Sequence, residues 1–333
     1  MHQFVQRACA MLLIFLAVPL FYSQQPASWK DPSPHSTRFV TVDKDVRLEV
    51  LDWGGSGRPL VLLAGGGDTA HVFDDFAPKL TGSFHVYGIT RRGFGESGYS
   101  ASEYGADRLG DDVLAVLDSL ELKRPVLVGH SIAGEELSSV ASRYPNRVAG
   151  LVYLEAGYPY AFDNGKGPTM NEFQGISGPQ PPSPGESDLA GFSALQQYYL
   201  RVLGFTYPEA ELRQQWDSTS DGRLGKQRDF PGYATLMGGI KKFSDIPVPA
   251  LVIFGIPHGQ GNWVDNSTDA KVREAAKAYS VALTVLTESQ AKAFEEGVPI
   301  ARVVRLRGAH HYVYLSNEAD VLREMHSFLS GLR

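Results

Sequence analysis

A serine surrounded by small residues is the clearest candidate for chemistry in this sequence. Residues 126–134 read VLVGHSIAG, an apolar run followed by small residues that open a helical pattern. A nucleophilic serine at a sharp strand-to-helix turn needs glycine or alanine nearby, because the backbone is strained and the helix approaches closely. Gly129 and Ser131 fit the G-x-S-x-G pattern, whereas Ala133 replaces its second glycine and Gly134 follows. We predict that Ser131 is a nucleophile; the alternative is a serine that caps the helix.

The elements that must position Ser131 alternate between strand-like and helical patterns. Strands are predicted at residues 39–42, 46–52, 60–64, 84–89, 126–128, 151–154, 250–254 and 302–306. Helices are predicted at residues 104–120, 132–144, 269–296 and 318–332. The first two strands are separated by residues 43–45 and predict a hairpin, whereas the later runs are almost continuously apolar. This combination indicates an α/β fold with a doubly wound, mostly parallel sheet that is covered on both faces.

Residues 158–245 interrupt this alternation. They contain the proline-rich run PQPPSPGES and many aromatic residues, without a clear strand period. Because a bare coil of that length is implausible, we predict a mainly helical cap over the carboxyl edge of the sheet. Residues 39–157 and 246–333 then form the core, and the polar, proline-rich residues 24–38 form a linker.

Taken together, these motifs resemble the α/β-hydrolase superfamily, in the subgroup with a cap inserted after the sixth strand. The resemblance covers residues 39–332 and includes TRRGFGESG at 90–98 and LRGAHHYVYLSN at 306–317. It implies a doubly wound sheet of eight strands with the active site at its carboxyl edge.

A serine nucleophile needs a base, and imidazole titrates near neutral pH without special tuning. Of the nine histidines, His310 and His311 follow the last predicted strand, where the family places its base. The family's histidine precedes an aromatic residue, and His311 precedes Tyr312. We therefore predict His311 as the base, with His310 as the alternative. A metal site built from this pair is disfavoured, because the H-E-x-x-H spacing is missing.

The third member of the site must be a carboxylate that orients the imidazole. The family usually supplies it after the seventh strand, but here that turn reads FGIPH, with His258 where the acid would stand. Some relatives carry the acid after the sixth strand, where residues 151–156 read LVYLEA. Buried strands rarely end in an unpaired acid, so we predict Glu155. Asp265 is the first alternative, and a Glu155 that only pairs with an arginine of the cap is the second.

The resemblance also implies two backbone amides that bind the developing oxyanion. One belongs to Ile132, and the other to the loop AGGGD at residues 64–68. Gly66 is the predicted donor in that loop, and Gly67 is the alternative if the donor lies one residue later. His130, before the nucleophile, is expected either to line the pocket or to pack. A phosphate-binding loop is disfavoured, because no G-x-x-x-x-G-K-[ST] motif is present.

The composition excludes several classes of function. The 333 residues are 43% hydrophobic and 20% charged, with 31 Lys and Arg against 37 Asp and Glu, for a net charge of −6. This balance gives no electrostatic footprint for nucleic acid. No motif indicates a nucleotide, flavin or metal cofactor, so the expected partner is a small-molecule substrate. The sequence leaves the oligomeric state open.

Residues 1–23 are typical of a secretory signal peptide. Arg7 precedes the apolar run ACAMLLIFLAVPLFY, which is short for a membrane-spanning helix of about 20 residues. We therefore predict export to the periplasm or the medium; the alternative is an uncleaved membrane anchor. The only cysteine, Cys9, lies in this segment, so cleavage would leave no thiol for disulfides or catalysis.

These residues predict hydrolysis through an acyl-enzyme intermediate. A serine nucleophile argues against the dehalogenase and epoxide-hydrolase relatives, whose intermediates are alkyl esters of a carboxylate. The aromatic cap and the scarcity of cationic pocket candidates favour small or medium apolar esters. Hydrolysis of amides, including aminopeptidase-like activity, and of carbon–carbon bonds uses the same residues and stays open. A non-catalytic binding protein of this fold is a further alternative.

Overall fold

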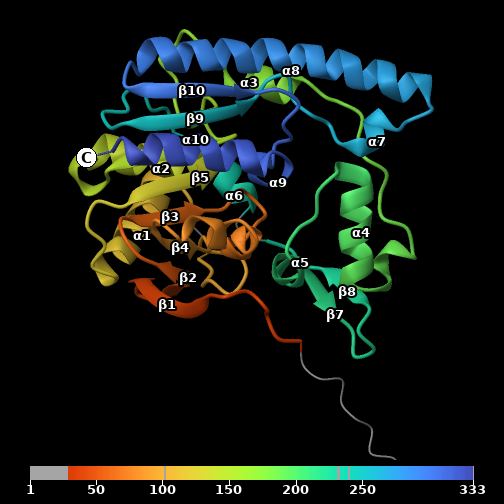
Figure 1. Cartoon of the computed structure of the whole chain (residues 1–333), viewed down its shortest axis with the longest axis horizontal. Helices are drawn as coiled ribbons and strands as arrows, with labels where there is room; N and C mark the ends of the chain where they lie inside the picture. The colour runs from red at the N-terminus through yellow and green to blue at the C-terminus, as the bar shows by residue number, and fades with distance from the viewer. Residues whose placement is uncertain (1–28, 101–102, 231–232, 239–240, 333) are drawn as a thin grey trace, which may run out of the picture. The chain divides into compact units, whose positions relative to one another are not determined.

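A sheet of eight strands organises the chain in the computed structural model (Figure 1). The structure describes residues 29–100, 103–230, 233–238 and 241–332. The order across the sheet is β1-β2-β4-β3-β5-β6-β9-β10. The strands are β1 (Ser36–Asp43), β2 (Val46–Gly55), β3 (Pro59–Leu63), β4 (His85–Ile89), β5 (Val126–His130), β6 (Gly150–Leu154), β9 (Ala250–Gly255) and β10 (Ala301–Leu306).

The sheet is antiparallel at one end and parallel across the rest. Strand β2 pairs antiparallel with both β1 and β4. Every later pair, from β4–β3 to β9–β10, is parallel. The predicted α/β class with a mostly parallel sheet is confirmed, and each predicted strand overlaps an observed one.

Alternate residues of the central strands pack into two hydrophobic cores, one on each face of the sheet. In β3, Val61 and Leu63 face one core and Leu60 and Leu62 the other. The first core is covered by helices α1 (Ala106–Ser119), α2 (Ala133–Arg143) and α8 (Ala270–Gly297). The second is covered by α9 (Val313–Ser316), α10 (Glu318–Ser330) and the 3₁₀ helices η1 (Ala70–Phe73) and η2 (Ala77–Leu80). Two-sided burial explains why these strands are continuous apolar runs.

The N-terminal boundary differs slightly from the prediction. Strand β1 begins at Ser36 rather than Phe39, because Ser36 pairs with Asp52 in β2 and Arg38 forms an ion pair with the same aspartate at 2.9 Å. The chain divides by packing into Met1–Asp31 and Pro32–Arg333, and every helix and strand named here lies in the second unit. The predicted signal peptide at residues 1–23, with Cys9, lies outside the described residues. No helix among the described residues is both long and apolar enough to cross a membrane.

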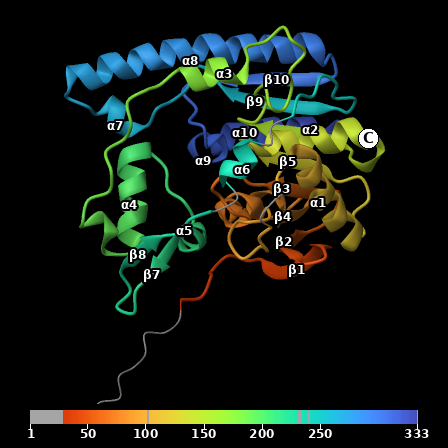
Figure 2. The same ribbon diagram turned by 180° about the vertical axis from the view of Figure 1, so that it is seen from behind.

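An insertion separates β6 from β9. Its helices are α3 (Met170–Gly175), η4 (Asp188–Ala190), α4 (Phe192–Leu203), α5 (Glu209–Gln215) and α6 (Tyr233–Gly238). It also contains a hairpin that we did not predict, formed by β7 (Trp216–Ser218) and β8 (Leu224–Gln227). Gly222 has φ +84°, and the Thr219 hydroxyl donates to the carbonyl of Arg223, which closes the turn. Helices α4 and α5 and this hairpin form one group beside the sheet in both views (Figures 1 and 2).

The carboxyl ends of the parallel strands lie at a single edge of the sheet. The loop after β3 carries Gly66, and the turn after β5 carries Ser131. Glu155 follows β6 directly, and His311 lies in the loop after β10. The remaining elements are η3 (Pro145–Arg147), near the other edge, and α7 (Asn262–Asp265), after β9. The topology therefore brings residues from distant parts of the chain to one place.

Candidate active site

Ser131 lies in a strained turn between β5 and α2. Its φ is +52°, in the left-handed region that non-glycine residues rarely occupy. The small neighbours permit this turn: a Cβ on Gly129 would come within 2.7 Å of Leu137, and one on Gly134 within 2.0 Å of the carbonyl oxygen of Ala156. In the usual motif the second glycine allows a neighbouring backbone to come close. Here Gly134 has this role, beside the backbone of Ala156. Strain of this kind occurs mainly where a functional group must be held in place.

His311 reaches Ser131 from the loop after β10. Its Nε2 lies 2.9 Å from the Ser131 hydroxyl oxygen. His130 holds the same loop, because its Nε2–H donates to the carbonyl of His311 at 3.0 Å. Burial lowers the pKa of His130 well below its ordinary value, and the neighbouring His311 ring adds to the shift. His130 was expected either to line the pocket or to pack, and it packs behind the site with 1% exposure.

Glu155 completes the contact on the other side of the imidazole. Its Oε2 lies 3.3 Å from Nδ1 of His311. The residue is fully buried and, like Ser131, has a left-handed backbone, with φ +49°. Oε2 also accepts a hydrogen bond from the Tyr158 hydroxyl at 2.6 Å and from Nε2 of His258 at 2.9 Å. The backbone N–H of Gly255 donates to Oε1.

These donors keep Glu155 ionised. Burial opposes the charged form, but the attraction of His258 and the hydrogen bonds of His258 and His311 outweigh it. Together they hold the pKa of the Glu155 carboxyl well below its ordinary range. A buried carboxylate of this kind can orient an imidazole and stabilise its protonated form.

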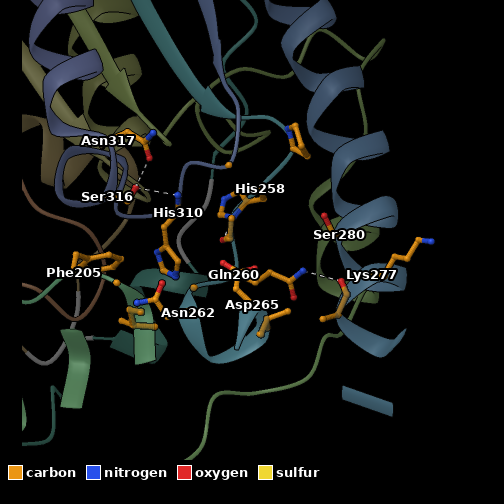
Figure 3. Close-up of a pocket in the computed structure, with 18 of the residues that line it drawn as sticks. Phe205, His258, Gln260, Asn262, Asp265, Lys277, Ser280, His310, Ser316 and Asn317 are labelled. Carbon is orange, nitrogen blue, oxygen red and sulfur yellow. Dashed lines mark hydrogen bonds between the residues drawn. The ribbon is translucent and has the colours of Figure 1, made fainter. Parts of the chain in front are cut away.

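The alternative residues occupy other places. The ring of His310 packs against Phe205 with centroids 5.0 Å apart, and burial lowers the pKa of His310 to about 3. Asp265 ends α7 and lines a cavity, and the described residues include no hydrogen bond between it and His311 (Figure 3). The structure therefore brings together Ser131, His311 and Glu155, and neither alternative.

Gly66 lies beside the side chain of the residue that follows Ser131. A Cβ on Gly66 would lie 3.5 Å from the side chain of Ile132 and 3.0 Å from the ring of Tyr233 in α6. The loop after β3 therefore lies next to the residue that follows Ser131, as an oxyanion site requires. Gly67, the alternative in register, has φ +90°, and a Cβ there would meet nothing within 4 Å.

Three residues of the site were not predicted as members of it. Tyr158 and Tyr160 follow Glu155 closely, and burial raises the pKa of both phenols well above the ordinary value. A hydrogen bond with Ser131 partly offsets this shift in Tyr160. The sequence marks His258 only as a departure from the usual acid at this position, not as a member of the site. The run YPY at residues 158–160, shortly after the acid, was the available signal.

The His311 ring borders a cavity of about 200 Å³. Pro179, Pro181, Leu203, Trp263 and Tyr279 supply its apolar wall. A larger cavity of about 780 Å³ shares His258 and His310 with it and is lined by more polar residues, among them Gln260, Asn262 and Ser280 (Figure 3). Lys277 also borders this space, but its amine points away from the other labelled side chains (Figure 3).

Among the described residues, one group at the site could hold a metal ion. The ligand atoms of Glu155, His258 and His311 all lie within 4.8 Å of one another. However, Nε2 of His258 and Nδ1 of His311 both contact the same oxygen of Glu155. Hydrogen bonding already uses the atoms that would bind the ion, so the donor set fits a proton relay better than a metal site.

A second group of buried acids lies behind the loop after β3. Glu211 of α5 accepts hydrogen bonds from the backbone N–H and the hydroxyl of Thr69, the latter at 2.5 Å. Asp68 accepts a hydrogen bond from the Tyr312 hydroxyl at 3.1 Å, and Gln215 donates to both acids. Burial raises the pKa of Asp68 and of Glu211, and the charge of Asp68 adds to the shift of Glu211. The insertion is therefore attached to the loop that carries Gly66.

The fold and the site together define a class of protein, and comparison with known proteins agrees. The model of the alpha/beta hydrolase family matches residues 60–324, and the chain belongs to that family. The AB hydrolase superfamily protein YisY of Bacillus subtilis is 31% identical over 238 residues, which cover 65% of this chain and 80% of that protein.

Other relatives match over shorter stretches. A putative non-heme haloperoxidase of Mycobacterium phage D29 is 31% identical, over 31% of this chain and 37% of its own length. The bifunctional esterase/perhydrolase DCH of Acinetobacter calcoaceticus is 31% identical, over 36% of this chain and 45% of its own length. The chain thus spans less than half the length of both proteins.

Solved structures share the fold. That of E-2-(acetamidomethylene)succinate hydrolase has a TM-score of 0.62 at 19% identity, and covers 89% of this chain and 100% of its own. That of carboxylesterase CesB from Bacillus subtilis has a TM-score of 0.54 at 18% identity, and covers 90% of this chain and 93% of its own. At these identities the likeness shows the α/β-hydrolase fold alone.

Proposed function

We propose that the chain is a serine hydrolase that cleaves carboxylic esters with Ser131, His311 and Glu155. The observation that carries this proposal is the line of contacts from the strained serine through the imidazole to an ionised carboxylate, at 2.9 and 3.3 Å. Nucleophile, base and orienting acid in this order are the parts that acyl transfer needs.

In the proposed reaction, the Ser131 oxygen attacks the ester carbonyl while His311 takes the hydroxyl proton. His311 then gives this proton to the leaving alcohol, and an acyl-enzyme remains. Water, deprotonated by the same imidazole, releases the acid and restores the serine. Glu155 orients His311 and stabilises its protonated form at both stages. The backbone amides of Gly66 and Ile132 bind the oxyanion, where removal of one donor typically costs about 3–4 kcal/mol.

We infer that the substrate is a small or medium ester with an apolar group. The support is the apolar wall of the cavity beside His311, with Trp263, Tyr279 and two prolines. The polar lining of the larger cavity lies farther along the same space and suits a polar end of the substrate. The esterase activities named for relatives and structural neighbours agree with this choice.

We also propose that the protein is exported. The support is the sequence of residues 1–23, in which a cationic start precedes a short apolar run. N-terminal sequencing of the protein from the medium or the periplasm tests this point: a mature protein without residues 1–23 is expected. A chain that retains Met1 in the membrane fraction would contradict it.

A fluorophosphonate probe tests the catalytic proposal most directly. Ser131 should form a covalent adduct that mass spectrometry locates, and Ser131→Ala should abolish both the adduct and ester hydrolysis. Ser142→Ala is the matched control, because the side chain of this half-buried serine of α2 bonds only the carbonyl of Asp245 among the described residues. A series of p-nitrophenyl esters of rising chain length, beside an aminoacyl anilide, identifies the bond type. A folded protein that forms no adduct would instead be a binding protein.

A further inference from the structure

Glu155 contacts two histidines with one oxygen, and only one of them reaches the serine. His258 lies in the loop after β9, and its Nε2 is 2.9 Å from Oε2 of Glu155, shorter than the 3.3 Å of His311. The His258 and His311 rings are stacked with centroids 6.3 Å apart. In the usual pattern of the family, position 258 holds the triad acid. In this chain Glu155 is the candidate acid instead, and the histidine at position 258 contacts it.

The hydrogen bonds of His258 define its charge. Nε2 faces the Glu155 carboxylate, and Nδ1 lies 3.3 Å from the carbonyl oxygen of Gly259. An ionised carboxylate and a carbonyl can only accept, so both ring nitrogens of His258 must carry a hydrogen. His311 differs, because its Nε2 faces the Ser131 hydroxyl, which can donate to it. The geometry thus makes His258 an imidazolium and leaves Nε2 of His311 free to accept a hydrogen bond from the serine.

The surroundings of His258 are consistent with this charge. Burial disfavours the imidazolium, but the attraction and hydrogen bond of Glu155 outweigh it, and the pKa of His258 is raised. Its side chain is 11% exposed, so solvent screens the charge weakly. The groups that face it from neighbouring elements, or line its cavities, are Glu155, His310, His311, Tyr279, Asp265, Arg273 and Lys277.

We propose that His258 is a positioning residue whose permanent positive charge balances Glu155 and extends the activity of the site to lower pH. The inference rests on the proposed function, because it concerns the same imidazole base. A neighbouring imidazolium repels a second positive charge at the site, so the acid limb of the activity profile lies at lower pH. At this ring separation the effect amounts to about two pH units, for an effective protein dielectric of about 20. The hydrogen bond of His258 also holds the carboxylate in line with His311.

Two substitutions separate the charge from the hydrogen bond. His258→Gln places an amide N–H near the former Nε2 and removes the charge, whereas His258→Leu removes both. The measurement is kcat/KM between pH 4 and 9 on a short p-nitrophenyl ester. For His258→Gln we expect the acid limb of the profile to move up by about two pH units. For His258→Leu we expect the plateau to fall about tenfold or more as well, because Glu155 loses a donor. An acid limb of His258→Gln that coincides with that of the wild type would overturn the inference.

A second measurement does not depend on catalysis. Nitrogen-15 NMR of the wild-type imidazoles, without substrate, should show one ring at pH 7 with both nitrogens protonated, assigned to His258 through its own backbone. A neutral His258 at pH 7 would refute the inference, whatever the enzyme hydrolyses. A protein without esterase activity or probe adduct refutes the proposed function instead, and the NMR result still decides the charge of His258.

Discussion

Glu155 and Glu211 are equally buried, with 0% exposure each, and yet their pKa values are shifted in opposite directions. Around Glu155, a phenol, a backbone amide and two imidazoles all offer hydrogens, and the pKa is lowered. Glu211 also accepts hydrogen bonds, from Thr69 and Gln215, but burial and the neighbouring Asp68 carboxyl group raise its pKa. Burial imposes the same penalty on both, so the partners decide which acid is ionised. The surroundings of Glu155 stabilise a negative charge, and those of Glu211 disfavour one.

Removal of the charge of Glu155 should have the largest effect. Glu155→Gln keeps the size of the side chain but not its charge, so His311 loses the group that stabilises its protonated form. We expect kcat for an ester substrate to fall about 10³–10⁴-fold, as in other triads that lose the orienting carboxylate. Steady-state kinetics measures the loss, and circular dichroism confirms that the variant is folded.

The matched control replaces the other acid considered for this role. Asp265→Asn changes a carboxylate that lines the larger cavity. We expect its kcat to stay within about twofold of the wild type, because it orients no catalytic ring. If Asp265→Asn were as inactive as Ser131→Ala while Glu155→Gln kept its activity, the assignment of the acid would be wrong.

Glu211 should instead control how stability depends on pH. Its pKa is raised to about 8 from an ordinary value of 4.5, so the folded protein keeps a proton that the unfolded chain releases. This contribution to stability is complete below about pH 4.5 and is lost as the pH rises through about 8. In the wild type the free energy of unfolding should decrease by an amount on the order of 4 kcal/mol between pH 5 and 9, and Glu211→Gln should remove this decrease.

Urea unfolding at pH 5, 7 and 9 measures this effect. Glu209→Gln is the control, because Glu209 belongs to the same helix but pairs with Arg213 instead of another acid. Parallel pH profiles for wild type and Glu211→Gln would show that the carboxyl is ionised in the folded protein.

Glu135 is a third buried acid and should have the smallest effect. Neither of its oxygens has a hydrogen-bond partner among the described residues, and burial and Glu136 raise its pKa to about 9. Glu135→Met fills the same space without a polar group and should raise the free energy of unfolding by about 1 kcal/mol at pH 7. Glu136→Met should lower it, because Arg91 would lose its ion-pair partner. A loss of stability in Glu135→Met would reveal a structural role for this acid.

Much of the fold could be predicted because buried parallel strands have a simple sequence pattern. Both faces of β5 and β6 are covered, so these strands are apolar without interruption and end at polar residues. Parallel strands end at one edge, which is why Ser131, Glu155 and His311 could be expected near one another. The β7–β8 hairpin could not be predicted in the same way, because its two strands are short and mostly polar.

The contacts between distant side chains were beyond the reach of sequence patterns. Glu211 and Thr69 meet only because the insertion folds back onto the loop after β3. The sequence showed His258 as a departure from the usual acid, but not that its ring turns toward Glu155. Side-chain direction in a loop depends on packing that no local motif records. The catalytic roles themselves stay predictions until the variants are measured.

The bond between Glu211 and Thr69 makes the insertion and the chemistry interdependent. Thr69 follows Gly66 closely in the same loop. A shift of α5 would therefore displace the backbone of Gly66, which is proposed to bind the oxyanion. Remodelling this enzyme for bulkier substrates by editing α5 would therefore alter turnover as well as fit. The safer place to enlarge the cavity is the wall at Pro179 and Pro181. These prolines precede α5 in the insertion and do not belong to the helix that bonds Thr69.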